Sequence, residues 1–146
     1  MIFRLALFLT FLSVVTPVWP ASCLIVGDSI AVGLAQQMPE CGSSARVGIR
    51  ASAVVGRVRQ ADRVIVSAGS NDLRDSAGLR AALERVRAGA GGGVVVWVLP
   101  ANGARQAVLS VARHHGDRTV SFRAGRDGVH PRSYRELANA LRRTCC

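Results

Sequence analysis

Short apolar segments rich in β-branched residues alternate along this chain with segments of helical pattern. The apolar segments occupy residues 23–26, 45–49, 63–68, 94–99 and 119–122. The first, third and fourth are nearly continuous apolar runs, which is typical of strands buried on both faces of a parallel sheet. The helical segments occupy residues 30–38, 52–60, 77–88, 104–115 and 133–143. This alternation predicts an α/β fold, in which helices cover both faces of a five-stranded parallel sheet.

The amino terminus, residues 1–21, has the pattern of a secretory signal peptide. Arg4 precedes an apolar run over 5–15, and Pro20 stands just before small residues that would follow a cleavage site. The apolar run is shorter than the roughly 20 residues that cross a bilayer, so we expect cleavage and no stable membrane insertion. Residues 22–146 then form one secreted or periplasmic domain of about 125 residues, which is long enough for a single core.

The formal net charge of the 146-residue chain is +10, and arginine supplies all of the positive charge because the chain has no lysine. One interpretation is attraction to an acidic partner such as an anionic polymer. The other is the codon usage of a GC-rich genome, which favours Arg, Ala, Gly and Val together. The arginines are scattered and lack the dense run or interleaved aromatic residues of a nucleic-acid surface, so we expect no nucleic-acid partner.

The chain contains four cysteines: Cys23, Cys41, Cys145 and Cys146. An even number of cysteines in an exported chain indicates disulfide bonds. No Cys-x-x-Cys pair or paired histidine spacing accompanies them, so the sequence predicts no zinc site. No motif for a cofactor is present either.

The carboxyl ends of parallel strands form the edge where such sheets bind ligands, so the loops there are the first to inspect. Ser29 follows the first apolar run in the segment Gly27-Asp28-Ser29. A serine at this turn can point its hydroxyl into the cleft, where the free N–H groups of the following helix stabilise an oxyanion. The alternative is an ordinary helix cap, for which Ser and Asp are both preferred.

Two further loops at this edge carry chemically useful side chains. Asn71, in Gly69-Ser70-Asn71-Asp72 after the third run, offers an amide donor. Asp127 and His130 follow the fifth run, and an Asp and a His three residues apart on a tight turn can face each other. The carboxylate then holds one ring nitrogen and leaves the other as a base. Together the loops supply a nucleophile, a donor and a base.

These three blocks, in this order, resemble those of the SGNH, or GDSL, hydrolase superfamily, and the resemblance covers residues 23–143. It implies a flavodoxin-like three-layer α/β/α sandwich and a serine esterase. Ser29 would be the nucleophile, His130 the general base and then acid, and Asp127 the residue that orients His130. The oxyanion donors would be the Ser29 N–H, the Asn71 side chain and one backbone N–H from the family's second block.

The second block departs from the family pattern, which has a glycine after the second strand. Gly48 comes early, and Ala51 falls nearer the expected position. A backbone N–H survives exchange of glycine for alanine where φ is negative, so Gly48 and Ala51 both remain candidate donors. The short chain leaves little for a lid, which predicts an open, shallow site.

Helices in this fold run antiparallel to the strands, so the four cysteines are expected at the edge opposite the catalytic loops. We therefore predict disulfide bonds that tie Cys145 and Cys146 to Cys23 and Cys41. A direct bond between Cys145 and Cys146 would be strained.

The first functional hypothesis is a monomeric esterase that removes small acyl groups from O-acylated polysaccharide, with Arg50, Arg74 and Arg126 as weak candidate substrate contacts or plain surface charge. Trp97 lies within a predicted strand and is expected in the core. A lipase or thioesterase of the same superfamily shares the triad and differs in the acyl pocket. A non-catalytic basic module that binds an anionic polymer is the third hypothesis.

Overall fold

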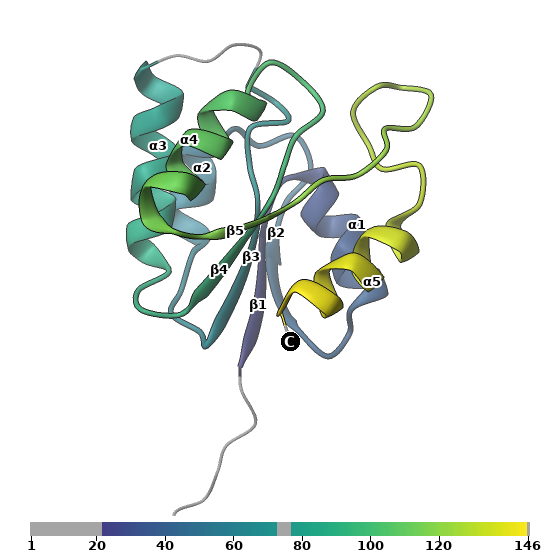
Figure 1. Ribbon diagram of the computed structural model, residues 1–146, viewed down its shortest axis with the longest axis horizontal. Helices are drawn as coiled ribbons and strands as arrows, with labels where there is room; N and C mark the ends of the chain where they lie inside the picture. The colour runs from purple at the N-terminus through teal and green to yellow at the C-terminus, as the bar shows by residue number, and fades with distance from the viewer. Residues whose placement is uncertain (1–21, 73–76, 146) are drawn as a thin grey trace, which may run out of the picture.

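The computed structural model describes residues 22–72 and 77–145, and in it five parallel strands form one sheet (Figure 1). The strands are β1 (Cys23–Gly27), β2 (Gly42–Ala45), β3 (Arg63–Ser67), β4 (Val94–Val98) and β5 (Arg118–Val120). Their order in the sheet is β2-β1-β3-β4-β5, which is the flavodoxin-like order. The predicted α/β fold is confirmed. The predicted signal peptide, Arg74 and Cys146 lie outside the described residues.

Helices cover both faces of the sheet, as Figure 1 shows. They are α1 (Ser29–Gln37), α2 (Ala51–Val54), the 3-10 helix η1 (Val55–Arg57), α3 (Ala77–Gly89), α4 (Arg105–His115) and α5 (Tyr134–Cys145). One core lies between the sheet and the pair α1 and α5, and the other lies beneath α2, α3 and α4. Among the described residues, no helix is long and apolar enough to cross a bilayer.

The central strands are apolar at their middle positions because both of their faces pack against helices. Along β3, Val64 and Val66 point into the core under α3 and α4, whereas Ile65 points toward α1 and α5. All three side chains are fully buried. Trp97 on β4 is also fully buried, and its Nε1 donates to Asp117 Oδ2 at 2.9 Å. Trp97 is therefore a core residue, as the sequence predicted.

The second strand lies three residues earlier than predicted. The apolar run 45–49 was expected to form it, but β2 consists of the small residues Gly42–Ala45. This strand is at the edge of the sheet and pairs only with β1, and the last ladder bond joins Arg46 N to Gly27 O at 2.9 Å. Beyond that point β1 has ended, so the run continues as a loop in which Val47 is 66% exposed.

Cys23 and Cys41 are bonded to each other, with 4.7 Å between their Cα atoms. The prediction that they bond to Cys145 and Cys146 of the tail is therefore wrong. The reason lies in the pairing of the edge strand: Leu24 pairs with Gly42, so the two cysteines precede the first paired positions of neighbouring strands. A bridge across 18 residues stabilises a domain by roughly 3 kcal/mol.

Candidate active site

The tight turn between β1 and α1 directs Ser29 toward the carboxyl edge of the sheet. Gly27 has a φ of +142°, and a Cβ there would lie 1.8 Å from the carbonyl oxygen of Ser67. Only glycine fits so close to the neighbouring strand. Asp28 is the residue that caps α1, because its carboxylate accepts from Ile30 N at 3.0 Å. The hydroxyl of Ser29, the first residue of the helix, is therefore not used as the cap.

Ser29, His130 and Asp127 form one continuous chain of hydrogen bonds. The Oγ of Ser29 lies 2.9 Å from Nε2 of His130, a residue 101 positions later in the sequence. The Nδ1 of His130 lies 2.6 Å from Oδ2 of Asp127. Because an ionised carboxylate only accepts, Nδ1 carries the ring proton, which leaves Nε2 to accept from the serine hydroxyl. The three residues are thus arranged as a nucleophile, a base and the group that orients the base.

Asp127 is held in its ionised form by its own turn. Its Oδ1 accepts hydrogen bonds from the backbone N–H groups of Val129 and His130, each at 3.0 Å. The Val129 N–H is the largest cause, followed by the His130 side chain and the His130 N–H, and together they lower the pKa of Asp127 to about 2. The carboxylate is therefore charged at neutral pH, as the orienting role requires.

The loop that carries Asp127 and His130 is closed like a small hairpin. Ala124 and Pro131 form an antiparallel bridge, Gly125 N donates to His130 O at 2.7 Å, and Arg132 N donates to Arg123 O at 2.8 Å. In Figure 1 this loop projects from the body of the molecule between β5 and α5. Because its ends are joined by backbone hydrogen bonds, His130 has a defined position although its side chain is 41% exposed.

Tyr134, at the start of α5, ties this loop to the helix that begins with Ser29. Its ring lies against Gly33 of α1 so closely that a Cβ there would be 2.4 Å from two ring carbons. Burial raises the pKa of the Tyr134 hydroxyl, and the nearby carboxylates of Asp28 and Asp127 add to the rise. The sequence analysis missed this contact. The available signal for it was Gly33, a glycine within a helical segment.

Asp28 is a second carboxylate beside the nucleophile, and it is fully buried. Its N–H donates to Ser67 O at 3.1 Å, and the Ser67 hydroxyl donates to its Oδ1 at 2.8 Å. Burial raises the pKa of Asp28, and the hydrogen bonds from the Ser67 hydroxyl and the Ile30 N–H oppose that rise. Asp28 thus joins the ends of β1 and β3 beneath Ser29, a role the sequence analysis did not assign.

Asn71 ties two of the predicted loops together at this edge. Its Nδ2 donates to the carbonyl oxygen of Ile49 at 2.9 Å. The amide nitrogen carries two hydrogens, so this bond fixes the side chain and leaves a second N–H to donate. The turn around Asn71 is itself held by Asn102, whose Nδ2 donates to the carbonyl oxygens of Gly69 at 3.1 Å and Ser70 at 2.9 Å.

The two candidate donors of the second block differ in their surroundings. Ala51 begins α2 and its φ is negative, because no described residue other than glycine has a positive φ. Its N–H donates to Asp72 Oδ2 at 2.9 Å, so it reaches an oxyanion only by leaving that carboxylate. Gly48 is exposed, with a φ of +76° and open space around it. Of the two, only Ala51 lies at a helix N-terminus.

A hollow of about 730 Å³ opens beside His130. Its lining residues are Ala124, Gly125, Arg126, Asp127, His130, Pro131 and Arg132. Arg126 is one of these lining residues, and its role as a substrate contact stays a prediction. Arg50 is exposed at the start of α2 and is not part of this lining.

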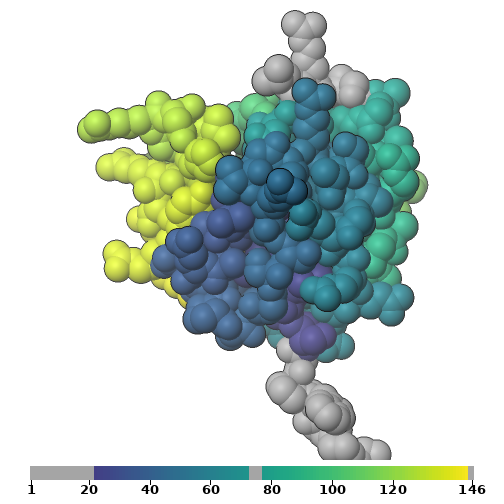
Figure 2. Space-filling model, turned by 180° about the vertical axis from the view of Figure 1, so that it is seen from behind, coloured from purple at the N-terminus to yellow at the C-terminus, as the bar shows by residue number. Residues whose placement is uncertain are grey.

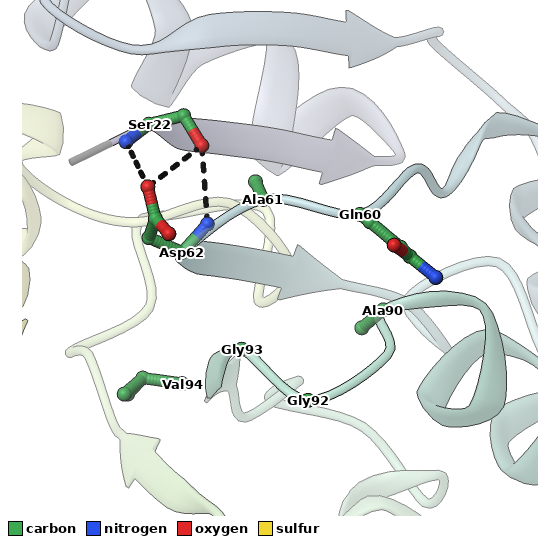
Figure 3. Close-up of a pocket in the computed structure, with 8 residues that line it drawn as sticks. All are labelled: Ser22, Gln60, Ala61, Asp62, Ala90, Gly92, Gly93 and Val94. Carbon is green, nitrogen blue, oxygen red and sulfur yellow. Dashed lines mark hydrogen bonds between the residues drawn. The ribbon is translucent and has the colours of Figure 1, made fainter. Parts of the chain in front are cut away.

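A second hollow, of about 490 Å³, lies at the opposite edge of the sheet, where β1, β3 and β4 begin (Figure 3). It contains one carboxylate, that of Asp62. Its Oδ2 accepts hydrogen bonds from Ser22 N at 2.6 Å and from Ser22 Oγ at 3.1 Å. Figure 3 shows these bonds and no histidine among the residues that line the hollow. This hollow therefore lacks the base that a serine nucleophile needs.

Within residues 22–72 and 77–145, no three His, Cys, Asp or Glu side chains are grouped so that they could hold a metal ion. No protein-family model matches the chain, and no curated protein matches it. The arrangement of Ser29, His130 and Asp127 is accordingly the evidence on which a functional assignment rests.

Proposed function

We propose that this protein is a serine ester hydrolase in which Ser29 is the nucleophile, His130 the general base and acid, and Asp127 the orienting carboxylate. The observation that carries the proposal is the pair of hydrogen bonds, of 2.9 Å and 2.6 Å, that links Ser29 to His130 and His130 to Asp127 and so joins two loops of the sheet edge. A nucleophile bonded to a base, with the base oriented by a third group, is the arrangement that nucleophilic acyl transfer requires.

The reaction has two balanced halves. Ser29 Oγ attacks the carbonyl carbon of the ester while its proton passes to His130 Nε2. The tetrahedral intermediate then expels the alcohol, which takes that proton from His130 as its bond to carbon breaks. In the second half, water gives a proton to His130 and attacks the acyl group on Ser29. The acid leaves, and the proton returns to Ser29 Oγ.

The developing oxyanion is stabilised by donors that are already in place. The Ser29 N–H belongs to the first turn of α1, whose N–H groups have no partner within the helix. The Asn71 amide lies at the same edge and is fixed by its bond to Ile49 O. The positive end of the α1 dipole acts in the same direction. The Ala51 N–H is a third donor once Asp72 releases it.

The substrate that we propose is a small acyl ester, such as an acetyl group on carbohydrate or another envelope polymer. The side chains of His130 and Asp127 are 41% and 53% exposed, so a polymer can approach the triad without a lid having to open. The hollow beside His130 has only Ala124 and Pro131 as apolar side chains, so it suits a polar part of a substrate better than a long apolar chain. The Cys23–Cys41 disulfide supports export to an oxidising compartment.

Hydrolysis of p-nitrophenyl acetate, measured on the protein with its disulfide intact, tests this proposal. Ser29→Ala should lower kcat by roughly 1,000-fold or more and abolish labelling by a fluorophosphonate. The matched control is Ser43→Ala, which removes an exposed hydroxyl from β2 and should leave both readouts unchanged. Equal rates for Ser29→Ala and the unsubstituted protein would reject the assignment. A series of acyl chain lengths separates a small-acyl esterase from a lipase or thioesterase.

A further inference from the structure

We infer that the ester this site cleaves carries negative charge on its alcohol portion, and that Arg126 and Arg132 bind that charge. The inference rests on the proposed function and adds the chemistry of the substrate. The two guanidinium groups line the hollow beside His130, and both side chains are exposed.

The position of the hollow indicates which half of the ester it receives. Its lining includes His130 and Asp127 but not Ser29, Asn71 or Ala51, so it lies beyond the imidazole as seen from the nucleophile. The acyl carbon bonds to Ser29 Oγ, whereas the leaving oxygen must face His130 to receive its proton. The alcohol portion of the substrate therefore extends over the loop that carries Arg126 and Arg132.

The positive charge of Arg126 and Arg132 is not neutralised by the other residues that line the hollow. Asp127 is its one acidic side chain, and its two oxygens already accept from Val129 N, His130 N and the imidazole. In the described part of the chain, the side chains of Arg126 and Arg132 make neither an ion pair nor a hydrogen bond. Two guanidinium groups are thus available to an anion.

Several other arginines form ion pairs or hydrogen bonds within the folded protein. Arg87 pairs with Asp117 at 2.8 Å, and Arg142 pairs with Glu40 at 2.9 Å. Arg105 donates to Ser121 Oγ at 3.1 Å. These arginines join α3, α4 and α5 to neighbouring loops. Arg126 and Arg132 have no such function, although their backbones are fixed by the hairpin that also fixes His130.

A guanidinium group recognises a planar or tetrahedral anion through parallel N–H···O bonds, so carboxylate and phosphate are the chemistries that fit. Figure 2 shows side chains of the carboxyl-terminal part, coloured yellow-green and yellow, that project from the molecule into open space. An extended polyanion can lie along such a surface, and the hollow of about 730 Å³ has more room than one small ion needs. The substrate class is therefore an acylated polymer with carboxylate or phosphate groups.

Matched aryl acetates test this inference on the intact protein. The neutral probe is methyl 4-acetoxybenzoate, and the anionic probes are 4-acetoxybenzoate and 4-acetoxyphenyl phosphate. We expect kcat/KM to be higher for at least one anionic probe than for the neutral one, and the better anionic probe identifies carboxylate or phosphate. The preference should shrink as ionic strength rises from about 0.02 M to 0.3 M, because exposed charges are screened.

The variant Arg126→Gln/Arg132→Gln should reduce the anionic-to-neutral ratio of kcat/KM by roughly 5- to 20-fold, which corresponds to two exposed ionic contacts. The control Arg85→Gln/Arg113→Gln removes the same charge from exposed positions on α3 and α4 and should keep the ratio. If the anionic-to-neutral ratio falls equally in both double variants, only the overall positive charge of the protein matters. If the unsubstituted protein shows no preference for an anionic probe, the site is indifferent to charge. Either result overturns the inference while turnover of the neutral probe still supports the esterase. Failure of all three acetates to turn over rejects both proposals.

Discussion

Gly33 of α1 and Tyr134 of α5 meet so closely that one methyl group on Gly33 would lie 2.4 Å from two ring carbons of Tyr134. This contact joins the helix that starts with Ser29 to the helix that starts four residues after His130. We therefore expect the distance between Ser29 Oγ and His130 Nε2 to depend on Gly33, although this glycine has no chemical part in the proposed reaction. We expect this contact to hold His130 Nε2 at its distance of 2.9 Å from Ser29 Oγ, because the loop of His130 leads directly into α5.

The first prediction follows from this contact. Gly33→Ala should destabilise the fold by about 1–3 kcal/mol, because the ring or the whole of α5 has to move. It should also lower kcat in protein that remains folded, because His130 moves away from Ser29. Thermal unfolding and p-nitrophenyl acetate hydrolysis measure the two effects.

A double-mutant cycle separates the contact from an ordinary effect of alanine in a helix. In a Tyr134→Leu background the Gly33→Ala change should cost much less, since the aromatic ring that it meets is gone. If Gly33→Ala has the same effect on stability and kcat in both backgrounds, the ring does not position the catalytic loop.

Asp127 leads to a prediction about pH. Its pKa of about 2 lies below the ordinary value of 3.8. Ionised Asp127 therefore favours the folded state above pH 4, and this contribution is lost as the pH falls from about 4 toward 2. The unfolding free energy of the unsubstituted protein should exceed that of Asp127→Ala at pH 6 by a small amount, because the group is exposed. The difference should disappear near pH 2. A difference that is the same at both pH values would show that the carboxylate charge is not what stabilises the turn.

Asn71 leads to a prediction about the oxyanion. Removal of one preorganised donor typically costs 10²- to 10³-fold in kcat, so Asn71→Ala should lower kcat by roughly that factor with little change in KM. Steady-state kinetics with a small acyl ester measure this split.

Asn71 also bonds to Ile49 O, so a structural control is needed. Asn102→Ala removes the side chain that holds the carbonyl oxygens of Gly69 and Ser70, and it loosens the same turn from outside the site. We expect Asn102→Ala to lower stability with a much smaller effect on kcat. If the two variants lose kcat equally, Asn71 acts only by holding the turn.

Most of the fold could be predicted from the sequence because burial on both faces leaves a direct pattern. The run 63–68 is apolar at every central position since both its faces pack against helices, and the structure places β3 there. The run 45–49 also contains β-branched residues, but its neighbour β1 ends at Gly27, so pairing stops at Arg46. The residues of a segment do not show where the neighbouring strand ends, so the end of pairing could not be predicted from them.

In the candidate site, too, residues could be predicted from their own segments, whereas contacts between segments could not. Ser29, Asn71, Asp127 and His130 could be named because each follows a strand, and parallel strands end at one edge. The Asp28–Ser67 bond, the Ala51–Asp72 bond and the Gly33–Tyr134 contact join residues from different loops or helices. The Cys23–Cys41 bond likewise depends on which strand lies beside β1. Such relationships follow from the order of the strands, which no single segment encodes.

The last prediction concerns that disulfide, which lies at the edge of the sheet opposite Ser29. Cys23 begins β1 and Ser29 lies just after its end, so the length of the strand separates the bond from the triad. The double variant Cys23→Ser/Cys41→Ser should lose roughly 3 kcal/mol of stability, as expected for a bridge that closes a loop of this length. Its kcat at a temperature where it stays folded should be close to that of the unsubstituted protein, because neither strand end at the catalytic edge moves. Alkylation of the unfolded, unreduced protein followed by peptide mass analysis should leave Cys23 and Cys41 unmodified. Alkylated Cys23, or a peptide that joins Cys23 to Cys145 or Cys146, would contradict the pairing.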